Sequence, residues 1–234
     1  MITSPARRRW IRFAALGLLA VLGVAAAVAG AAGLIWERTR KPTAAERSAA
    51  AVKEQLLRWR IRSVGEVFPP VVRDASAPAY RVGFAAPTGC SDALDAEAAK
   101  ALAAGGCQTV LRATYTDTSR TLLTTVAVAV MRDPSSASTA AGGLPSDSGG
   151  VRALPFAGTV ASHFRDEARQ VLGHETIVSG PYVFLQASGW ADGRAKLSDA
   201  DLDEKFAIAT TLATHLETFF ERAGDPCRIR GVRC

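Results

Sequence analysis

The chain has 234 residues and a formal net charge of +6, but this charge is unevenly distributed. Residues 1–36 carry four Arg and no acidic residue, residues 37–62 carry a net charge of +5, and residues 63–234 carry −3. A nucleic-acid-binding domain needs a basic surface of its own, so the acidic C-terminal part excludes a nucleic-acid partner.

An uncharged apolar segment occupies residues 13–35. Roughly 20 apolar residues in a helix suffice to cross the hydrocarbon core of a membrane. Trp10 and Trp36 flank the segment, and tryptophan favours the headgroup region of a bilayer. The segment therefore predicts a transmembrane signal anchor, preceded by a basic cytoplasmic tail at residues 1–12. Small residues at four-residue spacing, such as Gly23 and Ala27, also suit close contact between two membrane helices.

Orientation and cleavage of the segment have alternatives. Lys and Arg are equally numerous on its two sides, so the positive-inside rule alone does not decide the orientation. The short tail and the cysteines of the later part favour a C-terminal domain outside the cytoplasm. A cleaved signal peptide is the rival, because residues 27–29 read Ala-Val-Ala and residues 7–12 loosely resemble a twin-arginine signal. The apolar segment exceeds the ~7–15 residues of a signal h-region, which favours an uncleaved anchor.

Residues 36–78 follow as a juxtamembrane helix and linker. Thr43 and Glu46 have the spacing of a capping box, which predicts a helix over residues 44–60. Its apolar residues recur at alternating spacings of four and three and form one stripe, Ala45, Ala49, Val52, Leu56 and Trp59. This apolar stripe could pair with a sister helix, lie on the lipid surface, or pack on the domain that follows.

Residues 79–234 form the predicted extracytoplasmic domain. The strands expected from alternation and turn residues are 80–85, 107–116, 122–131, 175–179 and 182–190. The expected helices are 92–104, 134–141, 160–172 and 198–222. Both faces of the strand at 122–131 are apolar, so it should be central. This order predicts the α+β class, with an antiparallel or mixed sheet of about five strands and helices on one face.

The four cysteines all follow the apolar segment, namely Cys90, Cys107, Cys227 and Cys234. An even number suits two disulfides and an oxidising compartment. Three pairings are possible, and the local one is the simplest. A bond between Cys90 and Cys107 would close a loop of about 18 residues, worth about 3 kcal/mol by the loop-entropy argument.

Residues with catalytic or metal-binding chemistry are few. His163, Asp166 and Glu167 would share one face of the expected helix at 160–172, but such a group is usually a solvated face. We expect His174 at the surface and His215 at the boundary of the core. No common catalytic or nucleotide-binding motif occurs, so the sequence predicts no catalytic residue, no cofactor and no metal.

The densest aromatic segment after the anchor is at residues 180–194. It is typical of a core strand and a hairpin. Alternatively, it forms a binding surface, because aromatic residues beside an arginine are common contact groups. The candidate residues for that surface are Tyr182, Phe184, Trp190 and Arg194.

Several short stretches resemble an uncharacterised set of actinobacterial single-pass envelope proteins. The resemblance covers roughly residues 60–234 and lies in Gly89-Cys90, Gly106-Cys107, Leu111 to Tyr115, Gly180 to Val183 and Ala191 to Arg194. It implies a host with high-GC DNA and a single-pass membrane protein, and it implies no activity.

The sequence favours a membrane-anchored, extracytoplasmic, non-catalytic binding or interaction domain of the bacterial cell envelope, located at the plasma membrane. The expected partners are the lipid bilayer and either another protein or a second copy, contacted through the membrane or juxtamembrane helix. Two alternatives are an envelope hydrolase with a site assembled in space from Asp, Glu or His, and a self-associating subunit of an envelope complex.

Overall fold

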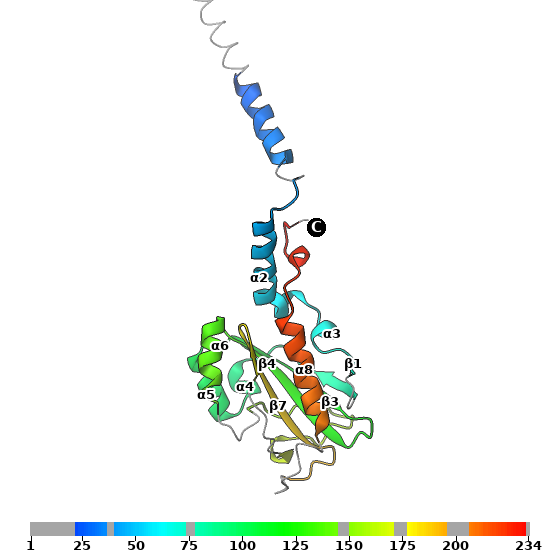
Figure 1. The fold of residues 1–234 in the computed structure, drawn as a ribbon. Coiled ribbons are helices and arrows are strands. Elements are labelled where there is room, and N and C mark those ends of the chain that lie inside the picture. The colour runs from blue at the N-terminus through cyan, green and yellow to red at the C-terminus, as the bar shows by residue number, and fades with distance from the viewer. Residues whose placement is uncertain are drawn as a thin grey trace, which may run out of the picture.

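The computed structural model describes residues 22–36, 40–73, 78–144, 150–170, 177–195 and 206–232. The chain belongs to the α+β class and is built on an antiparallel sheet of seven strands (Figure 1). The strand order is β1-β2-β3-β4-β7-β5, and β6 also pairs with β7. The antiparallel arrangement was one of the two expected from the sequence.

The strands are β1 (Val71–Val72), β2 (Ala79–Phe84), β3 (Thr109–Thr116), β4 (Leu122–Val130), β5 (Arg169–Gln170), β6 (Ile177–Ser179) and β7 (Tyr182–Trp190). The α-helices are α2 (Ala44–Ile61), α3 (Val64–Val67), α4 (Cys90–Ala93), α5 (Ala96–Ala104), α6 (Pro134–Ala141) and α8 (Ala207–Glu221). The described residues also form two short 3₁₀ helices, η1 (Asp166–Ala168) and η2 (Pro226–Arg228).

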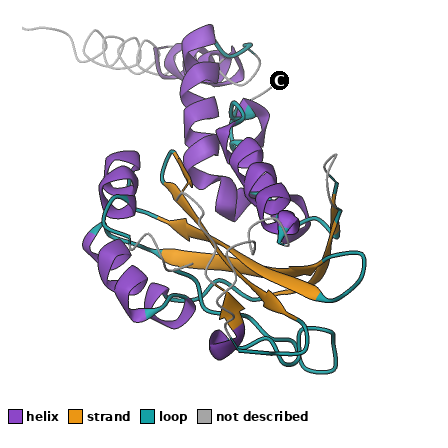
Figure 2. Cartoon of the chain, turned by 60° about the horizontal axis from the view of Figure 1, so that its bottom comes forward, coloured by secondary structure: helices purple, strands orange, loops and turns teal. Residues whose placement is uncertain are grey.

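The central position of β4 is confirmed, since it lies between β3 and β7 and both of its faces are buried. Val126, Val128 and Val130 point into a core formed with α8. Ala127 and Ala129 point into a second core formed with α4, α5 and α6. A strand that is apolar on both faces needs cover on both, so helices pack on both faces of the sheet (Figure 2). The expectation of helices on one face is therefore wrong.

The expected count of about five strands is also too low. The additional strands β1 and β5 have two residues each, too few for an alternating pattern to show in a sequence. They extend the sheet at its two ends.

The expected helix at residues 160–172 is wrong over the part of it that is described. Residues 160–163 form turns, and η1 and β5 follow. Asp166 accepts a hydrogen bond from the backbone N–H of Ala153 at 2.8 Å, and Thr159 accepts one from that of Ala161 at 3.1 Å. Such side-chain bonds to the backbone compete with helix formation.

The N-terminal part contains a helix at residues 22–36 whose residues are exposed. Residues 13–21 of the predicted anchor lie outside the described residues. Within the described ranges, no helix combines the length and the apolarity needed to cross a membrane.

The predicted bond between Cys90 and Cys107 is confirmed, with an S–S distance of 2.01 Å. It ties the start of α4 to the segment that leads into β3. Cys227 is disulfide-bonded as well, and Cys234 lies outside the described residues.

Candidate functional site: the junction between α2 and the end of α8

Helix α2 begins at the predicted capping box. The side chain of Thr43 accepts a hydrogen bond from the N–H of Glu46 at 3.2 Å, and the carboxylate of Glu46 accepts one from the N–H of Thr43 at 2.7 Å. Arg40 donates two further bonds to Glu46 at 2.6 and 2.8 Å. The bonds from Arg40, and then those from Thr43, lower the pKa of Glu46 to about 2. The start of α2 is thus fixed by groups within six residues of each other.

The charged face of α2, not its apolar stripe, packs on the domain. The buried residues of α2 are Ala50, Glu54 and Arg58. In contrast, Val52 is 57% and Leu56 is 41% exposed. Helix α2 therefore does contact the domain, but the apolar stripe faces away from it. Of the three placements considered for the stripe, packing on the domain is wrong, apart from a half-buried Trp59.

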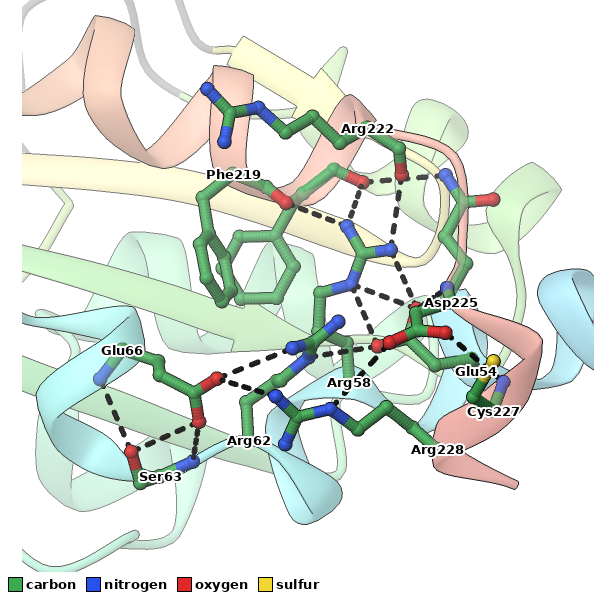
Figure 3. A network of polar contacts seen from close by, with 12 residues as sticks. Glu54, Arg58, Arg62, Ser63, Glu66, Phe219, Arg222, Asp225, Cys227 and Arg228 are labelled. Atoms are coloured by element: carbon green, nitrogen blue, oxygen red, sulfur yellow. Dashed lines mark hydrogen bonds and ion pairs between the residues drawn. The ribbon is translucent and has the colours of Figure 1, made fainter. Parts of the chain in front are cut away.

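Glu54 is the acceptor at the centre of this contact (Figure 3). Its side chain is fully buried. It accepts hydrogen bonds from Nη2 of Arg58 at 2.7 Å, from Nε of Arg62 at 3.0 Å and from the N–H of Asp225 at 3.2 Å. The last bond joins the middle of α2 to the chain that follows α8.

Arg58 is 2% exposed and binds the C-terminal end of α8. Its Nη1 donates to the carbonyls of Phe219 at 2.6 Å and Phe220 at 3.2 Å, and its Nη2 donates to the carbonyl of Arg222 at 3.0 Å. The last carbonyls of a helix lack partners within the helix and carry partial negative charge. The guanidinium of Arg58 donates hydrogen bonds to these carbonyls and carries a positive charge. Arg58 of α2 therefore caps the C-terminal end of α8.

Neutral contacts complete the junction. The hydroxyl of Tyr182 on β7 donates to the carbonyls of Gln55 at 2.8 Å and Leu56 at 3.2 Å. Gly224 lies against α2 so closely that a Cβ there would stand 1.8 Å from the carbonyl oxygen of Ala51. The chain after α8 can approach α2 to this extent only because residue 224 has no side chain.

Arg62 and the short helix α3 extend the network. Ser63 and Glu66 form a second capping box at the start of α3. Glu66 also accepts hydrogen bonds from Arg62 at 3.2 Å and from Arg228 of η2 at 3.4 Å. The network of charged residues thus extends from the buried Glu54 to the protein surface.

The electrostatics of the junction favour the ionised state. Burial alone would raise the pKa of Glu54, but the hydrogen bonds from Arg58 and Arg62 outweigh it and hold this pKa below its ordinary value. Burial would lower the pKa of Arg62, but its bonds to Glu54 and Glu66 raise it. A buried charge is tolerated when it is paired and fully hydrogen-bonded, and Glu54 meets both conditions.

Stability should therefore fall in acid. Because the folded-state pKa of Glu54 lies below its unfolded value, its contribution is complete above the unfolded pKa and is lost as pH falls through the folded pKa. We expect the free energy of unfolding, measured in urea on the full chain in detergent, to fall steeply below about pH 4.3. Glu54→Gln should be less stable at pH 7 and lose less on acidification. If the free energies of unfolding of the wild type and of Glu54→Gln fell in parallel with pH, Glu54 would not be the source of the acid sensitivity.

The predicted binding surface at residues 180–194 is divided between core and surface. Tyr182 is fully buried and Phe184 is 5% exposed, and both rings contact Phe220 of α8. Trp190 is half-buried and stacks under the guanidinium of Arg194, which is exposed. The core interpretation thus describes Tyr182 and Phe184, and only Trp190 and Arg194 reach the surface.

Within the described ranges, the histidines and acidic residues do not converge on one site. His163 is exposed, and Asp166 pairs with Arg152 at 3.2 Å. His215 is half-buried and its pKa is lowered by burial, although a hydrogen bond with the backbone of Val67 opposes this. His174 lies outside the described residues. No group of three potential metal ligands occurs in the part of the chain that is described.

Sequence reasoning did not identify Glu54 and Arg58 as site residues. An acid followed by a base four residues later is a common solvent-exposed pair on a helix. The sequence did indicate one relevant fact, namely that both residues lie on the face of the helix opposite the apolar stripe.

No protein-family model, no curated protein and no solved structure matches this chain.

Proposed function

We propose that the chain is a membrane-anchored, extracytoplasmic, non-catalytic interaction domain of the bacterial cell envelope. Its interaction surface is the apolar stripe of α2, and its partner is the same stripe of a second copy. The observation that carries this proposal is that α2 buries Glu54 and Arg58 and leaves Val52 and Leu56 exposed.

The junction supports this role because it fixes the direction in which the stripe points. Glu54 accepts a bond from the chain after α8, Arg58 donates to the end of α8, and Tyr182 donates to the backbone of α2. These bonds hold α2 to the domain at positions spread over more than one helical turn. Rotation of α2 to bury its stripe would break these bonds and leave buried charges unpaired, which is costly. The domain thus keeps its apolar helix face available to a partner.

A second copy fits the stripe better than an unrelated partner. The spacing of Ala45, Ala49, Val52 and Leu56 is that of positions facing each other in a two-stranded coiled coil. In a parallel pair, the flanking Ser48 would meet Lys53 of the other copy, and Gln55 would meet Arg60, so no like charges oppose each other. The predicted anchor would hold two copies parallel and at high local concentration, which compensates for the short length of α2.

Cysteine substitution in cells tests the surface. We expect Val52→Cys to form a disulfide-linked dimer when intact cells are treated with a mild oxidant. Glu97→Cys, at an exposed position on α5, is the matched control and should remain monomeric. The measurement is the ratio of dimer to monomer on non-reducing gels, after alkylation of free thiols.

Labelling of Lys53→Cys with a membrane-impermeant maleimide on intact cells tests the location of α2 separately. Labelling only after lysis would place α2 in the cytoplasm and contradict the extracytoplasmic assignment. The same reagent is applied to Val52→Cys. If this variant stays monomeric and lipid protects its thiol from the maleimide, the stripe lies on the membrane. Self-association would then be rejected.

A further inference from the structure

The side chain of Arg112 lies in the middle of the sheet, away from the α2–α8 junction. On β3, Leu111, Ala113 and Tyr115 face the core under α8. Because side chains alternate along a strand, Arg112 points to the opposite face, as do Val110 and Thr114. Its neighbour across the ladder is Ala127 of β4. Arg112 is only 8% exposed, so most of the residue is removed from water.

Among the residues that the structure describes, none accepts a hydrogen bond from the guanidinium of Arg112. Its Nε is buried without a hydrogen-bond partner. Within the described ranges, no hydrogen bond or ion pair joins the side chain of Arg112 to another residue. Arginine is almost always paired when it is buried, because an unpaired charge in the interior is costly. Burial, together with the nearby Arg152, lowers the pKa of Arg112.

A second buried polar atom without a partner lies close by. Thr88 exchanges both backbone hydrogen bonds with Val110, at 3.0 and 3.1 Å, so the two side chains lie on one face. Arg112 is the next residue of β3 on that face, at the diagonal position, roughly 7–8 Å away and within reach of a long side chain. Like Nε of Arg112, Oγ1 of Thr88 is buried and unpartnered.

The neighbouring acidic residues do not supply the missing partner. Asp166 is already bound by Arg152 at 3.2 Å and by the N–H of Ala153 at 2.8 Å. Asp92 is exposed and forms no ion pair with any residue that the structure describes. Both acidic groups act on Arg112 only through longer-range attraction.

The chain around this point encloses one face of the sheet. Thr114 donates to the carbonyl of Leu154 at 2.8 Å, and Thr125 accepts from the N–H of Leu154 at 3.1 Å. The N–H of Arg152 donates to the carbonyl of Ala93 at the end of α4. The segment 150–154 and α4 are thus tied together over the face on which Arg112 and Thr88 lie.

We propose that Arg112 and Thr88 bind an oxyanion, a carboxylate or phosphate group of a small ligand. The planar guanidinium matches the oxygens of either group, and the threonine hydroxyl supplies an additional donor. This site is independent of the apolar stripe of α2, since the two share no residue.

The test uses the full chain in detergent and two probes, inorganic phosphate and acetate, with sodium chloride at matched ionic strength as the reference. We expect phosphate, acetate or both to raise the Tm saturably, because a ligand that binds only the folded state stabilises it. The probe that acts identifies the oxyanion class. Equal effects of all three salts would overturn the proposal.

Three variants separate binding from structural roles. Arg112→Met should raise the Tm above that of the wild type in chloride, because it removes an unpaired buried charge, and should abolish the response to the probes. Thr88→Val should weaken affinity by about three- to tenfold, the value of one hydrogen bond. Asp92→Asn should strengthen binding, because it removes a nearby negative charge.

Opposite results from the same variants would overturn the proposal. If Asp92 is the true partner of Arg112, then Asp92→Asn lowers the Tm and the probes have no effect. Asp92 is exposed, so this variant should fold even if Arg112→Met does not. Arg132→Gln, at an arginine that is 70% exposed, controls for general charge effects and should leave the response to the probes unchanged.

Discussion

Replacement of Arg58 with alanine is expected to lower the free energy of unfolding by about 3–5 kcal/mol. The variant would remove the main partner of the buried Glu54 and leave the carbonyls of Phe219, Phe220 and Arg222 without their donor. Urea unfolding of the full chain in detergent, followed by tryptophan fluorescence, measures the change. Trp59 lies beside Arg58 on α2 and should report on this region.

Two further variants show whether the loss comes from the unpaired charge. Replacement of both Glu54 and Arg58 with methionine removes the charges together, so the double variant should be more stable than Arg58→Ala alone. Arg194→Ala breaks an exposed ion pair with Asp192 and should lower the free energy of unfolding far less than Arg58→Ala does. If Arg58→Ala were no more harmful than Arg194→Ala, the junction would not hold α2 to the domain.

The second large effect is expected from loss of the bond between Cys90 and Cys107. The two residues are 17 positions apart. Removal of a crosslink of this length increases the entropy of the unfolded chain and should cost about 3 kcal/mol, or a fall in Tm of about 6–12 °C for a domain of this size. The double variant Cys90→Ala/Cys107→Ala, studied by thermal unfolding, measures this effect without disturbing Cys227.

Treatment of the wild type with a reductant provides the comparison for this double variant. Reduction opens the disulfide of Cys227 as well, so its effect should be at least as large. A double variant with the Tm of the wild type would show that the crosslink constrains a part of the chain that unfolds separately from the rest.

Elements with a strong local pattern could be predicted from the sequence. The capping box of Thr43 and Glu46 lies within one turn, so no distant residue is needed to form it. The alternation of valine and alanine in β4 indicated a strand with two buried faces, which the two cores confirm. The strand at β7 was also found, since its long apolar run ends at turn residues.

Features that depend on distant partners could not be predicted. The burial of Glu54 and Arg58 requires the end of α8, more than 160 residues away, and nothing in the sequence near α2 shows that end. The absence of a helix over the described residues 160–170 depends on the contact of Asp166 with Ala153. For Arg112 a signal was present, since a lone charge stood in an otherwise buried strand, but its lack of a partner is visible only in three dimensions.

The distance along the chain between the two halves of the junction also orders the folding of the protein during its synthesis. Arg58 is made early, whereas the carbonyls that it binds belong to residues 161 to 164 positions later. Until those residues leave the ribosome, Glu54 and Arg58 remain in water and α2 has no surface on which to rest. Pairing between such distant segments is also slow, because a long loop must close first. Helix α2 is therefore synthesised before the segments on which it packs and is among the last elements to reach its final position.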